Sequence, residues 1–141
     1  MKYYCEDPEL NQLYKKHADD AGFDICAAED YELGSTDRVL VSTKLHVAIP
    51  KGYVGILKPR SGLSIDYGTN IGAGVVDAGY LGEIKVVLTA QTFPFIIHKG
   101  DRIAQMLILK LPQVEPEKVD SLEALGVTDR GEAGFGSTGG Y

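Results

Sequence analysis

The chain has 141 residues, enough for one domain with a substantial hydrophobic core. Its apolar content of 44% is ordinary for a globular protein, and no apolar run approaches the roughly 18 residues that a membrane helix needs, so we expect a soluble protein with no membrane partner. The net charge of −6 disfavours nucleic acid as a partner, because such a ligand requires an extended basic surface.

The N-terminal residues lack the apolar stretch and the small-residue cleavage pattern of a secretory signal. We therefore expect a soluble intracellular protein, cytoplasmic or nuclear. Cys5 and Cys26 are the two cysteines, and the sequence gives no other indication of an oxidising compartment or of a zinc site. Both are predicted to be free thiols.

Alternation of apolar and polar residues predicts a half-buried strand at residues 39–49, which Pro50 ends. Other β-rich runs follow at residues 53–57, 84–89, 93–97 and 103–111, with glycine-containing turns between them. Helical signals are confined to one or two turns at residues 61–67 and another at 121–125. Short strands with frequent turns predict an all-β fold, a single-domain β-sandwich or barrel with one short helix, which we place at residues 1–125.

Residues 126–141 form a glycine-rich C-terminal arm, in which six of the sixteen residues are glycine. Such a segment has little to bury and its backbone is costly to order, so we expect a flexible arm that folds onto a ligand. Among the glycines stand Arg130, Phe135, Ser137 and Thr138, which are suited to binding a polyphosphate and stacking on a base. A frayed terminus is the alternative interpretation.

Two segments before the centre of the chain carry polar groups that packing does not readily explain. Asp24 stands among small and apolar residues at the start of a strand, where a turn is the plainer interpretation. Arg60 and Ser61 lie where a strand leads into the short helix, and helix starts of that kind bind phosphate. The alternative there is a Ser-capped turn with a surface arginine.

Two later segments have the same character. Residues 72–83 combine glycines, which let the backbone approach a ligand, with Asp77 as a possible base and Tyr80 as a flat ring. A plain β-hairpin would also use these glycines. Residues 100–106 open a strand and place Gln105 within reach of a ligand, while Arg102 is expected to pair with Asp101 or with the arm.

Together and in this order, the five segments resemble the motifs of the homotrimeric all-β deoxyuridine triphosphatases. The five motifs of that family are approximately A-G-x-D-L, P-R-S-G-L, G-V-I-D-x-D-Y-R-G-E, G-[DE]-R-I-A-Q and R-G-x-G-G-F-G-S-T-G. This sequence reads AGFDI, PRSGL, GVVDAGYLGE, GDRIAQ and RGEAGFGSTG. The resemblance implies a distorted jelly-roll, a homotrimer with active sites shared between subunits, and hydrolysis of dUTP to dUMP and pyrophosphate. That reaction keeps uracil out of DNA and supplies dUMP for thymidylate synthesis.

The resemblance also implies roles for single residues. Asp77 would activate the water that attacks the α-phosphorus, with Gln105 and Arg130 as further catalytic residues, and Asp24 would hold Mg²⁺ through a bound water. The substrate-binding residues would be Arg60, Ser61 and Gly62 at the phosphates, Gly72, Gly74, Val75 and Val76 at the uracil, Tyr80 at the deoxyribose, and Phe135, Gly136, Ser137 and Thr138 on the arm. Uracil would be recognised by main-chain groups of a hairpin at residues 72–76.

Three positions depart from the family pattern. Gly79 replaces a second acid, Leu81 replaces Arg or another polar residue, and Ala133 replaces the first of two paired glycines. These changes are compatible with slower turnover and do not indicate a different reaction. Two alternatives to the dUTP hydrolase are a dCTP deaminase, which would carry a catalytic Glu in the hairpin segment, and a non-catalytic nucleotide sensor whose arm switches a partner surface.

Overall fold

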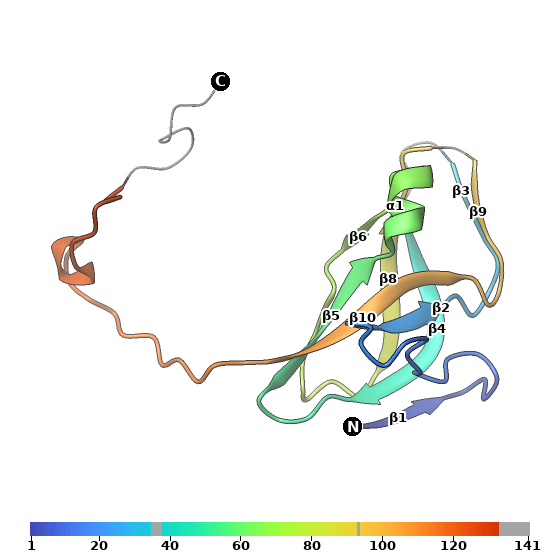
Figure 1. The fold of residues 1–141 in the computed structure, drawn as a ribbon, viewed down its shortest axis with the longest axis horizontal. Coiled ribbons are helices and arrows are strands. Elements are labelled where there is room, and N and C mark those ends of the chain that lie inside the picture. Colours follow the sequence, from blue (N-terminus) through green and yellow to red (C-terminus); the bar gives the residue numbers. More distant parts are fainter. Residues whose placement is uncertain (35–37, 93, 133–141) are drawn as a thin grey trace.

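The computed structural model describes residues 1–34, 38–92 and 94–132, which form three antiparallel sheets and one short α-helix (Figure 1). The first sheet has the order β1 (Lys2–Cys5), β4 (Arg38–Ala48), β8 (Glu83–Thr89) and β6 (Asn70–Gly72). The second has the order β2 (Phe23–Cys26), β10 (Arg102–Lys110), β5 (Tyr53–Pro59) and β7 (Val75–Val76). A third, two-stranded sheet pairs β3 (Tyr31–Leu33) with β9 (Phe95–Ile97).

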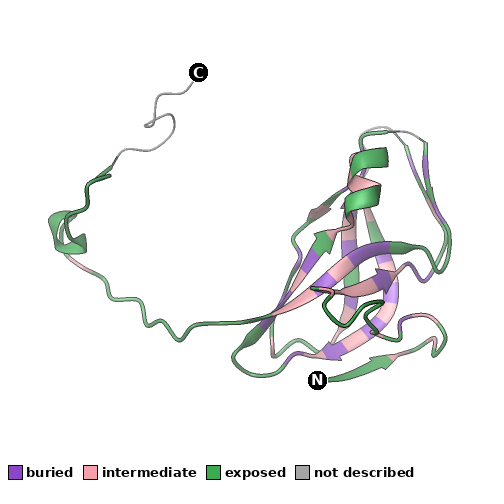
Figure 2. Cartoon of the chain, viewed as in Figure 1, coloured by how far each residue is buried: buried purple, intermediate pink, exposed green. Residues whose placement is uncertain are grey.

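The core lies between the two four-stranded sheets. In β4 every second side chain is buried while its neighbours are partly exposed, which is the pattern of a strand with one face on the core. Buried residues are concentrated on the strands of both sheets (Figure 2). The fully buried side chains include Ile25, Val41, Leu45, Ile84, Val86, Leu88, Ile103 and Met106. The predicted all-β fold with one short helix is confirmed.

The longer predicted elements match the structure closely. The strand expected at residues 39–49 is β4, those at 84–89 and 103–111 are β8 and β10, and the short helix is α1 (Ser61–Tyr67). The turn at 121–125 is a 3₁₀ helix, η1 (Glu123–Leu125). The strand predicted at 93–97 begins at Phe95. The strands β1, β3, β6 and β7 were not predicted, because two to four residues are too few to show a period.

The hairpin predicted at residues 72–76 is wrong. β6 pairs with β8 in the first sheet and β7 pairs with β5 in the second, so Ala73 and Gly74 carry the chain from one sheet to the other. Gly74 has a φ of 94°, and a Cβ there would lie 3.0 Å from the Leu57 carbonyl oxygen. The Leu57 amide in turn donates to the Gly74 carbonyl at 2.7 Å. Pairing with two distant strands therefore replaces the local pairing that a hairpin requires.

Beyond β10 the chain leaves the folded body. Residues 112–132 extend away from the sheets and are almost all exposed (Figures 1 and 2). Apolar side chains on this segment face solvent in the single chain, with Val114 73% and Val127 99% exposed. The body of one subunit thus ends near residue 111, and the division of the domain at residue 125 stays a prediction. No helix in the described part of the chain is both long and apolar enough to cross a membrane.

Candidate functional site

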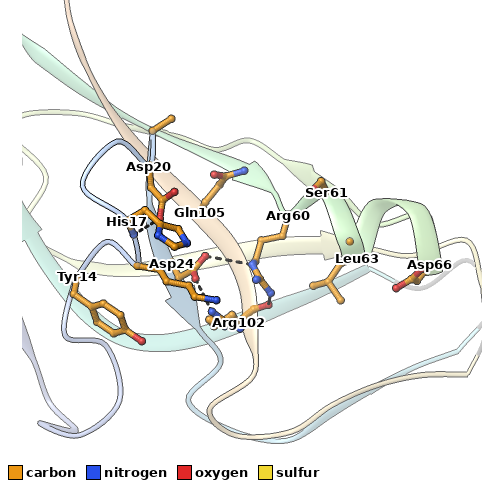
Figure 3. Close-up of a pocket in the computed structure, with 14 residues that line it drawn as sticks. Tyr14, His17, Asp20, Asp24, Arg60, Ser61, Leu63, Asp66, Arg102 and Gln105 are labelled. Atoms are coloured by element: carbon orange, nitrogen blue, oxygen red, sulfur yellow. Dashed lines mark hydrogen bonds and ion pairs between the residues drawn. The ribbon is translucent and has the colours of Figure 1, made fainter.

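A cleft of about 540 Å³ opens between the loop at residues 6–22, the β5–α1 junction and the strands β2 and β10 (Figure 3). We call it the arginine cleft. Its lining side chains are mostly polar or charged and come from three separate parts of the sequence. They are Tyr14, Lys16, His17, Asp20, Asp24, Arg60, Ser61, Asp66, Arg102 and Gln105, with Ala21, Gly22, Gly62 and Leu63 between them.

The β5–α1 junction places Arg60 and Ser61 at the mouth of this cleft. β5 ends at Pro59, Arg60 keeps an extended backbone with φ −85° and ψ 138°, and α1 begins at Ser61. Pro59 favours an end to the strand pairing because it has no amide hydrogen to donate. A Cβ on Gly62 would meet no atom within 4 Å, so the backbone at that position borders open space. The segment therefore presents a guanidinium, a hydroxyl and bare backbone together.

Asp24 organises the cations of the arginine cleft. Its Oδ1 lies 3.2 Å from Arg60 Nε and its Oδ2 accepts a hydrogen bond from an Arg102 terminal nitrogen at 3.1 Å. Arg60 also donates to the Arg102 main-chain carbonyl at 3.1 Å. Figure 3 shows the two guanidinium groups converging on the one carboxylate. The two guanidinium groups and Asp24 together carry one net positive charge, which suits a polyanionic ligand. Lys16 adds a further cation to the lining and Asp20 and Asp66 add two carboxylates, so the positive charge is confined to the pair of arginines.

Gln105 lies beside Asp24, because the two residues face each other across the β10–β2 ladder. Its amide nitrogen donates to the Pro59 carbonyl at 3.1 Å. Gly22 allows this packing, since a Cβ at that position would lie 3.3 Å from Gln105 Oε1 and 3.1 Å from the Met106 carbonyl oxygen. The close approach of β10 therefore favours glycine at position 22.

The predicted base lies in a different cleft, of about 260 Å³, which we call the Asp77 cleft. It is lined by Leu57, Ala73, Gly74, Val75, Val76, Asp77, Tyr80, Glu83, Ile84 and Lys85. The Tyr80 amide donates to the Asp77 carbonyl at 3.1 Å, and the Tyr80 hydroxyl donates to the Glu83 carbonyl at 2.9 Å. A Cβ on Gly82 would lie 2.5 Å from the Tyr80 hydroxyl oxygen, so a side chain at position 82 would displace the tyrosine from this position.

No described residue lines both clefts. The sequence-predicted residues Asp24, Arg60, Ser61, Gly62 and Gln105 lie in the arginine cleft, and Gly74, Val75, Val76, Asp77 and Tyr80 lie in the Asp77 cleft. Gly72 ends β6 and lines neither, and Arg130 is on the exposed arm. Ala133, Phe135, Gly136, Ser137 and Thr138 are outside the described residues. The described part of a single chain does not bring the predicted base and the predicted phosphate ligands into one cleft.

Several residues of the arginine cleft were missed from the sequence. The expectation that Arg102 pairs with Asp101 or the arm is wrong, because its ion-pair partner is Asp24, from a strand 78 residues earlier. Lys16 and His17 also line the cleft. The basic run at residues 15–17, immediately before the first motif, is a signal that could have identified an anion-binding loop. In the described ranges, His, Cys, Asp and Glu form no group of three or more that could hold a metal ion.

Glu83 was also missed from the sequence, and it lines the Asp77 cleft. Its Oε1 accepts hydrogen bonds from the Thr43 amide at 3.1 Å and the Lys44 amide at 2.9 Å, and the Ser42 hydroxyl donates to the same oxygen. These donors belong to an irregularity in β4, where the register shifts and Lys44 has a φ of 56°. Burial raises the pKa of this carboxyl, but the hydrogen bonds and the nearby Lys85 ammonium lower it from 4.5 to about 2.

Replacing Glu83 with Gln should therefore reduce the free energy of unfolding by about 1–3 kcal/mol at neutral pH. The depressed pKa means that the ionised carboxylate stabilises the fold fully above about pH 4.5, and that this contribution is lost as the pH falls towards 2. The difference between wild type and variant should shrink over that range. Urea unfolding at fixed protein concentration measures it, with the exposed Glu32→Gln as control. A pH-independent difference would contradict the role of the charge.

Comparison with known proteins gives a family match. The family model described as dUTPase matches residues 9–139. The chain is 45% identical to the deoxyuridine 5′-triphosphate nucleotidohydrolase of Mycobacterium leprae (strain Br4923), over 96% of this chain and 92% of the relative. It has the same identity and coverage with the protein of that name from Mycobacterium tuberculosis (strain H37Rv).

Solved structures agree with the sequence comparison. The fold is similar to that of a Staphylococcus bacteriophage 80alpha dUTPase variant with dUpNHpp, with a TM-score of 0.86 and 29% identity over 98% of this chain and 97% of that one. It is also similar to a dUTPase variant of phage phi11 of S. aureus, described with a structural Mg(II) ion, with a TM-score of 0.77 and 26% identity over 86% and 97% of the two chains.

Proposed function

The chain belongs to the dUTPase family and hydrolyses dUTP to dUMP, and we propose that it does so in an active site assembled from both clefts. The observation that carries this proposal is the separation of Asp77 from the cations at Asp24 into two clefts that share no described residue. Phosphoryl transfer depends mainly on positioning and charge neutralisation, so both sets of groups are needed around one substrate. A second subunit would supply the missing half.

The arginine cleft would bind the triphosphate. Arg60, Ser61 and Gly62 offer a guanidinium, a hydroxyl and an accessible backbone, and Gln105 adds an amide on the neighbouring strand. Asp24 holds the two arginines in a fixed orientation before the substrate arrives. Less side-chain entropy is then lost when the phosphates bind.

The Asp77 cleft would receive the nucleoside. Asp77 is exposed at its rim, where its carboxylate would orient and deprotonate the attacking water. The ring of Tyr80 is held by its hydroxyl on Glu83 and would pack against the deoxyribose, leaving no room for a 2′-hydroxyl. Main-chain groups at Gly72, Ala73 and Val75 are in an exposed crossover between the sheets and would recognise uracil. The Gly74 carbonyl already accepts a hydrogen bond from the Leu57 amide, which fixes the crossover against β5.

Family members generally use Mg²⁺. The arginine cleft is compatible with this ion, because Mg²⁺ is held by one or two carboxylates together with waters and substrate phosphates. Asp24 would bind it through a water molecule, since each carboxylate oxygen has a lone pair beyond the one used by its arginine. When bound, Mg²⁺ neutralises negative charge on the phosphate chain.

The arm would complete the site as a homotrimer assembles. The exposed apolar residues Leu122 and Leu125 just before the arm, and Val127 within it, favour contact with a neighbouring subunit over solvent. Arg130 would reach the far phosphates, and Phe135, Gly136, Ser137 and Thr138 would close over the base and the triphosphate. Removal of dUTP would keep uracil out of DNA and supply dUMP for thymidylate synthesis, in a soluble intracellular setting, cytoplasmic or nuclear.

Deleting residues 130–141 should leave the β fold and the trimer intact, while kcat/KM for dUTP falls by about 10²-fold or more. The reason is that the deletion removes Arg130 and the residues proposed to exclude water, but none of the core. Size-exclusion chromatography and circular dichroism check the fold, and pyrophosphate release measures the rate. A truncated protein with near-normal kcat/KM would contradict the role of the arm.

Pyrophosphate release from dUTP, dTTP, dCTP and UTP, with and without Mg²⁺, tests the proposed function as a whole. Only dUTP should be turned over rapidly, with the rate dependent on the metal. Rejection of UTP would support the packing of Tyr80 against the sugar. Ammonia released from dCTP would instead indicate a deaminase, and tight dUTP binding without turnover would indicate a nucleotide sensor.

A further inference from the structure

His46 connects the Asp77 cleft to the first sheet. It stands in β4 opposite Tyr4 of β1 and opposite Glu83 of β8, so it occupies the middle of three strands. Its ring Nδ1 lies 2.9 Å from the main-chain carbonyl oxygen of Leu81, and its Nε2 lies 3.2 Å from Glu6 Oε1. The histidine therefore joins the N-terminal strand to the loop that follows Tyr80.

Both partners of the His46 ring can only accept hydrogen bonds. A carbonyl oxygen and a carboxylate carry no proton at neutral pH, so both ring nitrogens must donate, and the ring that makes both bonds is the imidazolium cation. The Leu81 carbonyl raises the pKa of His46 most, and the Glu6 carboxylate raises it further. Glu83 also favours the cation, while Lys44 is bound to Glu6 at 3.9 Å and Lys85 to Glu83 at 3.4 Å.

Through the Leu81 carbonyl, His46 contacts the chain next to the turn that carries Asp77 and Tyr80. Leu81 follows Tyr80 in the chain, immediately after the turn that the bond between the Tyr80 amide and the Asp77 carbonyl closes. The Tyr80 hydroxyl donates a hydrogen bond to the Glu83 carbonyl of β8, and the His46 ring of β4 is hydrogen-bonded to the Leu81 carbonyl. The two anchors restrain the turn from two different strands.

Resting on the function proposed above, we propose that His46 is a positioning residue whose imidazolium form holds the turn that carries Asp77 and Tyr80. When the ring loses a proton, one N–H remains for two acceptors. That N–H is shared between the Leu81 carbonyl at 2.9 Å and the Glu6 carboxylate at 3.2 Å, so the bond to Leu81 is made in only part of the molecules. The turn is then anchored from β4 only part of the time, and Asp77 is held less well against the attacking water.

The decisive experiment combines an NMR titration with kinetics. In the wild-type trimer, kcat for dUTP should fall by about two- to fivefold as the pH rises through the pKa of the His46 ring, while KM changes little, since the bond to Leu81 is then made in only part of the molecules. The amide resonances of Tyr80 and Gly82 should titrate with the same pKa. His46→Gln, which donates one hydrogen bond at every pH, should remove this step from the kcat profile. The matched control is His98→Gln, which should keep it.

Glu6→Gln provides a second variant that retains the histidine. It should lower the ring pKa, and it should also reduce the fall in kcat, because the introduced amide can donate to the unprotonated ring nitrogen and leaves the remaining ring N–H to Leu81. An unchanged kcat step in His46→Gln, or Tyr80 and Gly82 amides that do not follow the ring, would overturn the inference. The NMR result is independent of turnover, so it separates this failure from failure of the proposed function, in which the wild-type protein would not hydrolyse dUTP at all.

Discussion

Replacing Asp77 with Asn should lower kcat for dUTP by about 10²- to 10⁴-fold while leaving nucleotide affinity nearly unchanged. The two side chains have almost the same shape, but the amide cannot accept a proton from water. Asp77 is exposed and no packing depends on its charge, so the fold should tolerate the change. The turn is closed by the Asp77 main-chain carbonyl, which the substitution keeps.

Single-turnover rates and calorimetric titration with dUpNHpp separate chemistry from binding in this variant. Glu32→Gln is a suitable control, because it also neutralises an exposed carboxylate but lies on β3, in neither cleft. A variant with a near-normal rate would show that another group activates the water. A variant that no longer binds the analogue would assign Asp77 to substrate binding instead.

The parts of the fold that were predictable are those in which the information is local. Strands β4, β8 and β10 are seven to eleven residues long and show either alternation or sustained β-branched composition. The step from β5 into α1 was predictable because Pro59 and Ser61 mark the end of one element and the start of the next. The same local signals placed most of the candidate site residues.

The parts that were not predictable depend on partners distant in sequence. The crossover at Ala73 and Gly74 exists because β5 and β8 offer pairing on different sheets, and glycines in a short segment do not distinguish this from a hairpin. The pairing of Arg102 with Asp24 spans 78 residues. In the sequence, nothing distinguishes Glu83 from an ordinary acidic residue next to a glycine. Its carboxylate nevertheless accepts hydrogen bonds from main-chain amides in the irregular part of β4, about 40 residues earlier.

The separation of the two clefts leads to the other large expected effect, which concerns mixed trimers. Arg60→Ala should inactivate the arginine cleft of its own subunit, and Asp77→Asn should inactivate the Asp77 cleft of its own subunit. Each homotrimer should be nearly inactive. If one active site uses the two clefts of different subunits, trimers formed from equal amounts of both variants should recover about one quarter of wild-type kcat, because each half of a site is intact with a probability of about one half.

Co-expression of the two variants at equal levels, with a different affinity tag on each, gives a random mixture of trimers for pyrophosphate assays, and pull-down through either tag confirms that mixed trimers form. The control carries both substitutions on one chain and is mixed with wild type in equal amounts. Shared sites predict about one quarter of wild-type kcat for this mixture as well, whereas sites within single chains predict about one half for it and none for the first mixture. The pair of values therefore distinguishes the two arrangements even if assembly reduces both rates. Recovery of no activity in the first mixture would show that each subunit must bring its own Asp77 to its own arginine cleft.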